Sequence, residues 1–256
     1  MNLYLESLKL NSGKTFLNVA KELSKIKPIV VLKAGKGEAG RRAVHSHTGS
    51  LAGDYRIFSA AFKSAGIVEA DDINVLADVS EVLALNKTPK PGSLPVIVTN
   101  SGGPAVVLAD HVENYNLSVE GLPSNLREEV RKAIPEYASV ENLDLLAEAD
   151  SELYYKVLNI LMEDERVGVI TTIVNPPPQI DSLEVTKAII EVWNEHNRTK
   201  PLILYYCGFN IEKSITHARK QNVPVTESLR GTALAIKALY DRGVWLEKHT
   251  RRNIMY

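Results

Sequence analysis

The chain has 256 residues, of which 45% are hydrophobic and 24% are charged, and its formal net charge is −1. This composition is typical of a globular protein with one large domain or two modest ones. The nearly balanced charge argues against a general nucleic-acid-binding protein, which carries a basic surface. No stretch approaches the roughly 20 apolar residues of a membrane-spanning helix, and residues 1–10 lack the features of a signal peptide. We therefore expect a cytoplasmic protein with neither membrane nor nucleic acid as a partner.

The N-terminal part alternates short apolar runs with helical patterns. Strands are expected at residues 2–5, 29–32 and 66–68, and helices at 15–25, 54–65 and 71–83. The run at residues 29–32 is apolar without interruption, which is typical of a strand that is buried on both faces of a parallel sheet. Residues 86–93 contain two prolines and a glycine and predict a linker.

The second part repeats this alternation. Strands are expected at residues 95–99, 117–119, 167–174 and 202–205, and helices at 104–115, 124–132, 151–162, 182–195, 212–221 and 230–241. Strands that alternate with helices imply parallel sheets covered on both faces. We predict an α/β protein with one domain over residues 1–87, a second over 93–243 and a C-terminal tail over 244–256.

A weak internal repeat supports two related domains. The pattern Lys27-Pro28, four residues, then Lys33-Ala34-Gly35 is echoed by Lys200-Pro201, four residues, then Tyr206-Cys207-Gly208. In the first copy a longer segment separates this pattern from the next strand, which indicates an inserted loop that contains His47. The alternative is coincidence, because Lys-Pro before a strand is common.

The inserted segment, residues 35–53, reads GKGEAGRRAVHSHTGSLAG. Its glycines allow the backbone to approach a ligand closely, and successive exposed N–H groups can form an anion-binding nest. Lys36, Arg41 and Arg42 supply charge suited to phosphate, and a neutral histidine can act as a nucleophile near pH 7. On composition alone, a surface loop with a solvated basic cluster is an equally good interpretation.

Two further segments are candidates for the site. Glu6 follows the first strand, and the glycine-rich segment follows the next one, so both leave carboxyl ends of strands, where ligands gather in open α/β sheets. A carboxylate there can orient the imidazole of His47. The turn Asn100-Ser101-Gly102-Gly103 precedes a helix, whose N-terminus can bind an anion. The plainer alternatives are an exposed acid and a tight turn.

A metal site is not expected. Cys207 is the only cysteine, so neither an internal disulfide nor a multi-cysteine metal site can form. His196, His217 and His249 have no carboxylate or histidine at the spacing of metal ligands.

Several segments resemble the NDP-forming (ADP-forming) acyl-CoA synthetases, relatives of the succinyl-CoA synthetase α subunit. The resemblance rests on residues 31–36 (VLKAGK), 38–40 (EAG) and 46–53 (SHTGSLAG), and extends to 3–7, 61–67, 98–104 and 138–144. It covers nearly the whole chain. It implies two flavodoxin-like parallel-sheet domains, of which the first is N-terminally incomplete.

The resemblance also implies a reaction and roles for residues. In this family acyl-CoA, ADP and phosphate interconvert with carboxylate, CoA and ATP, and a histidine carries the phosphate. That role falls on His47, with Glu6 as the supporting carboxylate, whereas His45 matches no histidine of the family. The phosphate-binding residues would be Ser46, Thr48, Gly49, Ser50, Asn100, Ser101, Gly102 and Gly103.

The chain departs from the family in what it lacks. We identify neither the Rossmann-like CoA-binding domain nor the ATP-grasp nucleotide domain, so CoA, ADP or ATP, and Mg are expected on other domains and no cofactor is expected to bind this chain tightly. An ATP-grasp subunit and a CoA-binding domain or chain are the expected partners, in a homo- or hetero-oligomer. The exposed edge of an incomplete sheet favours such pairing. In addition, Leu143 stands where the family usually has proline.

The sequence leaves three hypotheses open. The chain is part of an assembled acid-thiol ligase, or a shortened form of such an enzyme, or a non-catalytic binding or regulatory module that kept the fold. The presence of His47 and Glu6 favours the first, and the missing phosphate-binding turn of the incomplete domain favours the last.

Overall fold

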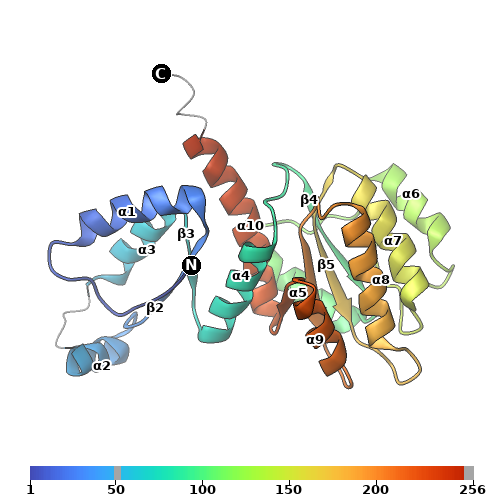
Figure 1. Cartoon of the computed structure of the whole chain (residues 1–256), viewed down its shortest axis with the longest axis horizontal. Coiled ribbons are helices and arrows are strands. Elements are labelled where there is room, and N and C mark those ends of the chain that lie inside the picture. The colour runs from blue at the N-terminus through green and yellow to red at the C-terminus, as the bar shows by residue number, and fades with distance from the viewer. Residues whose placement is uncertain (49–52, 251–256) are drawn as a thin grey trace.

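A computed structural model describes residues 1–48 and 53–250, which form two lobes side by side (Figure 1). Each lobe is built on a parallel sheet that carries helices, which confirms the predicted α/β fold with two parallel-sheet units. Across these described residues, every helix is too short or too polar to cross a membrane.

The smaller lobe contains a three-stranded sheet in the order β1-β2-β3. Its elements are β1 (Asn2–Leu5), α1 (Gly13–Ile26), β2 (Ile29–Lys33), α2 (Glu38–Thr48), α3 (Tyr55–Ser64) and β3 (Ile67–Ala70). The apolar run of β2 is central and buried, as its composition predicts, and it packs against Phe62 of α3. Leu5 pairs with Lys33, so the carboxyl ends of β1 and β2 lie next to each other.

The larger lobe contains a four-stranded sheet in the order β4-β5-β6-β7. Its strands are β4 (Leu94–Thr99), β5 (Val167–Val174), β6 (Leu202–Tyr206) and β7 (Val225–Thr226). Its helices are α5 (Gly102–Asn114), α6 (Ser124–Ala133), α7 (Ser151–Glu163), α8 (Ser182–Glu195), α9 (Glu212–Lys220) and α10 (Leu229–Thr250). Every residue of β5 is buried, because helices cover both faces of this sheet.

Helix α4 (Ile73–Leu85) joins the two lobes into one packed body. By sequence it follows β3, yet Val79 and Val82 lie in an apolar cluster that also contains Ile203 and Ile236 of the larger lobe. The side chain of Asn86, just after α4, pairs with both backbone groups of Leu202, at 2.9 and 3.1 Å. The lobes therefore share part of a core.

Three segments differ from the expected elements. Residues 117–119 form no strand, and β4 is the edge strand of the larger sheet. Much of the expected glycine-rich loop is helix α2, which contains a single glycine, begins with Glu38 and buries Val44. Residues 244–250, expected in a tail, continue α10, because Trp245 packs against Gly66 of the smaller lobe.

The weak sequence repeat corresponds to matching structure. Each copy forms a parallel strand, β2 or β6, that is followed by a turn at glycine. Gly35 has a φ of 74° and Gly208 a φ of 94°, a region that favours glycine at both turns.

Lys200 makes the stability of the larger lobe depend on pH. Its ammonium donates to the carbonyls of Leu161, at 2.8 Å, and Asp164, and burial lowers its pKa to about 8. An unfolded lysine has a pKa of about 10.4, so between these values the unfolded chain binds more protons and the free energy of unfolding rises with pH. With allowance for solvent screening, Lys200→Met should remove about 1–2 kcal/mol of that rise.

Urea denaturation of both proteins across this alkaline range measures the difference. Lys156→Met is the matched control, since Lys156 is exposed on α7 and forms an ion pair with Glu152 of the same helix. If the free energy of unfolding of Lys200→Met depends on pH as that of the wild type does, the Lys200 ammonium is not the source of the pH dependence.

Candidate functional site

A buried lysine lies beneath the carboxyl edge of the smaller sheet. Lys33 is only 2% exposed, and its ammonium donates to the carbonyl of Glu6 at 2.7 Å and to that of Ala34. The ring of Phe58 lies 4.8 Å from the same nitrogen. Burial lowers the pKa of Lys33. These contacts tie the end of β1 to the end of β2, so Lys33 fixes the local position of the Glu6 backbone.

Glu6 lies where the sequence predicts it, at the bend that follows β1. Its side chain is half-buried, and one carboxylate oxygen accepts a hydrogen bond from the Tyr4 hydroxyl at 3.3 Å. The amide of Ala34 donates to the carbonyl of Leu5 at 3.0 Å, so the sheet pairing continues up to this point. Glu6 thus flanks the start of the glycine-rich segment.

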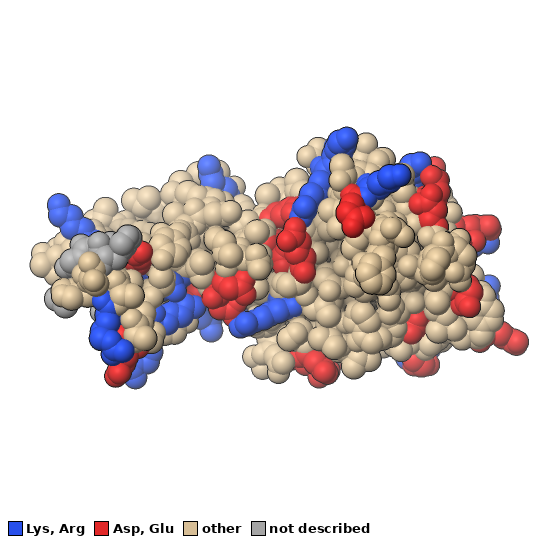
Figure 2. Space-filling view, turned by 90° about the horizontal axis from the view of Figure 1, so that it is seen from below, with Lys and Arg blue, Asp and Glu red and all other residues tan. Residues whose placement is uncertain are grey.

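Helix α2 crosses closely over the end of β2. A Cβ on Gly40 would lie 3.2 Å from the Cα of Gly35, so glycine at this position permits the close approach. Arg42 and His45 project from α2 into solvent, and the nearest carboxylate to Arg42 is Glu38, at 4.0 Å. Figure 2 shows basic side chains gathered on this end of the smaller lobe. Of the three predicted basic residues, Arg42 is therefore exposed and Arg41 half-buried, whereas Lys36 is half-buried and pairs with Glu69 at 2.8 Å.

The predicted phosphate carrier lies at the end of this helix. His47 and Thr48 are its last two residues, and their side chains fall outside the described structure. Ser46 is exposed on the helix, and Gly49 and Ser50 lie outside the described residues. That His47 meets Glu6 stays a prediction.

The second candidate turn, Asn100–Gly103, connects β4 to α5. The side chain of buried Asn100 pairs with both backbone groups of Asn175, at 2.8 and 3.0 Å. The side-chain amide of Asn175 donates in turn to the Ser101 hydroxyl at 3.2 Å. The side chains of Asn100 and Ser101 therefore join the ends of β4 and β5. The backbone N–H groups of Gly102 and Gly103, in the first turn of α5, are the donors suited to an anion.

An acidic residue beside this turn has no role in the sequence-based prediction. Asp144 lies so close to Gly102 that a Cβ there would be 2.8 Å from its carboxylate. The segment is held by hydrogen bonds from Thr99 to Leu143, at 3.0 Å, and from Leu145 to Thr99, at 2.7 Å. A carboxylate suits the helix dipole but opposes a bound phosphate. The backbone of Leu143 has a φ of 47°, which proline cannot adopt, so the departure from the family pattern has a structural cause.

The structure does not bring the two groups of predicted residues into one site. In Figure 1, α2 lies at the outer end of the smaller lobe, whereas α5 lies in the larger lobe. Among residues 1–48 and 53–250, no group of three or more His, Cys, Asp or Glu side chains is placed to hold a metal ion.

Comparison with known families matches both parts of the chain. Residues 1–83 match the succinyl-CoA ligase like flavodoxin domain, and residues 95–241 match the Ligase-CoA domain. The chain is 36% identical over 241 residues to the acetate–CoA ligase [ADP-forming] II subunit alpha of Pyrococcus furiosus, which covers 93% of this chain and 52% of that protein. It is 34% identical over 255 residues to the alpha subunit of acetate–CoA ligase [ADP-forming] I of the same organism, which covers 98% of this chain and 54% of that protein.

The fold agrees with a solved structure. The dinucleotide forming acetyl-coenzyme A synthetase 1 of Ca. Korarchaeum cryptofilum, in complex with phosphate and ADP, superposes with a TM-score of 0.88 at 28% identity, over 96% of this chain and 54% of that one. The chain thus spans about half the length of these relatives. Both halves and the fold lead to the same conclusion: the chain belongs to the family of ADP-forming acyl-CoA ligases that is related to succinyl-CoA ligase.

Proposed function

We propose that this chain carries phosphate in an ADP-forming acyl-CoA ligase, with His47 as the carrier. The overall reaction is acyl-CoA + ADP + phosphate = carboxylate + CoA + ATP. The observation that carries the proposal is the family match over both halves of the chain, together with the sequence of residues 46–50, of which Ser46, His47 and Thr48 end α2. The P. furiosus relatives are named as alpha subunits of ADP-forming acetate–CoA ligases.

The proposed chemistry has three balanced steps. Phosphate displaces CoA from acyl-CoA and gives an acyl phosphate. An imidazole nitrogen of His47 then attacks the phosphorus, and the carboxylate leaves. Finally the phosphoryl group passes from His47 to ADP, which regenerates the imidazole and forms ATP. Histidine suits this relay because its neutral form is a nucleophile near pH 7.

The described residues support this role from two sides. Lys33 holds the Glu6 backbone at the sheet edge, where the Glu6 carboxylate would orient the His47 ring and favour its charged form. Arg41 and Arg42 on α2 supply positive charge near the end of the helix that carries His47. We propose two phosphate-binding sites. The residues of the first are Ser46, Thr48, Gly49 and Ser50, and those of the second are Asn100, Ser101, Gly102 and Gly103.

The proposal requires further protein. The chain spans about half of its relatives, so we propose an ATP-grasp subunit that holds ADP and Mg, and a CoA-binding domain or chain. The cytoplasm is the expected location, because the substrates ADP and CoA are found there.

The test is phosphoryl transfer to the chain itself. The chain is mixed with the ATP-grasp subunit encoded in the same genome and with ATP labelled at the γ-phosphate. We expect label that is lost in acid and kept in base, because phosphohistidine is acid-labile. His47→Ala should abolish this label, and His45→Ala should retain it.

The alternative function is a non-catalytic binding or regulatory module. The position of Asp144 beside Gly102, where it would repel phosphate, favours this alternative. In that case the chain binds the nucleotide subunit but takes up no label. Absence of label in the presence of a partner that binds, or equal label in His47→Ala, would contradict the carrier role.

A further inference from the structure

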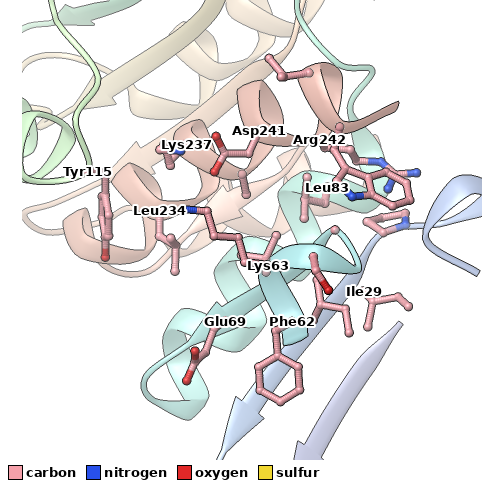
Figure 3. Close-up of a pocket in the computed structure, with 18 of the residues that line it drawn as sticks. Ile29, Phe62, Lys63, Glu69, Leu83, Tyr115, Leu234, Lys237, Asp241 and Arg242 are labelled. Atoms are coloured by element: carbon pink, nitrogen blue, oxygen red, sulfur yellow. Dashed lines mark hydrogen bonds and ion pairs between the residues drawn. The ribbon is translucent and has the colours of Figure 1, made fainter. Parts of the chain in front are cut away.

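A crevice of about 1030 Å³ lies between the two lobes, away from the residues of the proposed phosphate relay. Figure 3 shows Phe62 and Lys63 of α3 and Glu69 of β3 on one side, with Lys237 and Arg242 of α10 on the other. The strand β3 forms part of the wall with its outer edge, because it pairs only with β2 within the described sheet. Residues from both lobes therefore line one cavity.

Two contacts fix the walls of this crevice relative to each other. Trp245 of α10 packs against Gly66, where φ is 68° and a Cβ would lie 2.6 Å from the indole ring. The guanidinium of Arg242 donates to the carbonyl of Ser24 at 3.0 Å. The indole also stacks on His249, with 4.2 Å between the ring centroids. These contacts attach the C-terminal part of α10, which forms one wall of the crevice, to the smaller lobe, which forms the other wall.

The charges that line the crevice are unbalanced. Its two acids already have partners: Glu69 lies 2.8 Å from the ammonium of Lys36, and Asp241 pairs with Lys237. The remaining cations that line it have no acidic partner within the described part of the chain, and these are Lys63, Arg242 and Lys248.

The indole nitrogen of Trp245 has no hydrogen-bond acceptor among the described atoms, but it is buried against Gly66 and is not a contact for a ligand in the crevice. The groups that line the crevice without an acidic partner are thus cations. A ligand that complements them has to supply negative charge.

We propose that this crevice is a binding site for an organic anion, of the class of phosphorylated or sulfonated metabolites. Its negative group would lie between Lys63 and Lys248, which reach the crevice from opposite lobes. Cavities of about 300–1,000 Å³ hold drug-sized ligands, so the space far exceeds that of inorganic phosphate. Apolar side chains provide contact for the organic part, namely Ile29, Phe62, Leu83, Leu234, Ala238 and Val244.

Such a ligand would contact both lobes at once. Because it binds the assembled body and not the unfolded chain, it would stabilise the junction between the lobes. The site is distinct from the phosphate relay, and its existence does not depend on the role of His47.

Two fluorescent probes of nearly the same shape test the proposal on the full chain. Anilinonaphthalene sulfonate is an organic anion, and phenylnaphthylamine is its uncharged analogue. We expect saturable binding of the sulfonate at one site per chain. The double variant Lys63→Gln, Lys248→Gln should weaken the sulfonate at least about tenfold and leave the uncharged analogue within about twofold.

The matched control is the double variant Lys213→Gln, Lys220→Gln. Both lysines are exposed on α9 and neither lines the crevice, so their loss should change neither probe. All four lysines are exposed, so the variants should fold. The proposal is overturned if the sulfonate does not saturate, if the Lys63 and Lys248 variant binds it as the wild type does, or if both probes weaken equally.

Discussion

Replacement of Gly231 by alanine is expected to lower the free energy of unfolding by about 2–4 kcal/mol, although alanine is the better helix former. A Cβ at this position, in the first turn of α10, would collide with the carboxylate of Asp78 and lie 2.7 Å from the Ser228 hydroxyl. Asp78 is 3% exposed and accepts hydrogen bonds from the amide of Glu227 at 2.8 Å and the hydroxyl of Ser228 at 2.8 Å. If the Asp78 side chain moved to make room for the Cβ, its buried carboxylate would lose these donors, and the free energy of unfolding would fall.

Urea denaturation at neutral pH measures the effect, and Gly243→Ala is the matched control in the same helix. A Cβ on Gly243 meets its nearest atoms, in Thr88 and Pro89, only at 3.5 Å, which is an ordinary contact. That variant should be as stable as the wild type or up to about 1 kcal/mol more stable, because alanine loses less backbone entropy in a helix. Equal losses in the two variants would mean that the contact with Asp78 does not set the stability of this junction.

The packing of α4 against the start of α10 shows what could and could not be predicted about the fold. The strands follow from uninterrupted apolar runs, such as Ile29–Leu32, because a strand buried on both faces needs such a run. The start of α4 follows from Asp72, whose carboxylate caps the helix by accepting from the amides of Asn74 and Val75. That α4 packs into the larger lobe could not be predicted, because its apolar face fits either sheet. The choice depends on three-dimensional contacts such as Asp78 with residues 227–228.

The candidate site was predicted less completely than the fold. Glu6 could be placed because a residue that follows a parallel strand has to lie at the carboxyl edge of the sheet. The burial of Lys33 was missed, since lysine is rarely buried unless its charge has partners, and here those partners are backbone carbonyls without a sequence signal. The helix α2 was missed because its neighbouring glycines indicated a loop.

Glu6→Gln is expected to slow phosphorylation of the chain about a hundredfold, if His47 is the carrier. Glutamine keeps the size of the side chain and can still accept the hydrogen bond from Tyr4, which is 3.3 Å long. The backbone bond from Lys33 to the Glu6 carbonyl is also unaffected. Only the negative charge is lost, and with it the stabilisation of a charged imidazole. The initial rate of acid-labile labelling, with the nucleotide subunit in excess, measures the effect.

Glu38→Gln is the control, because Glu38 is an exposed acid at the start of the helix that carries His47, and lies 4.0 Å from its nearest cation. It should leave the rate unchanged, so a loss confined to Glu6→Gln cannot come from the overall charge of the lobe. A Glu6→Gln protein that is labelled at the wild-type rate at neutral pH would remove Glu6 from the relay while leaving His47 as the carrier.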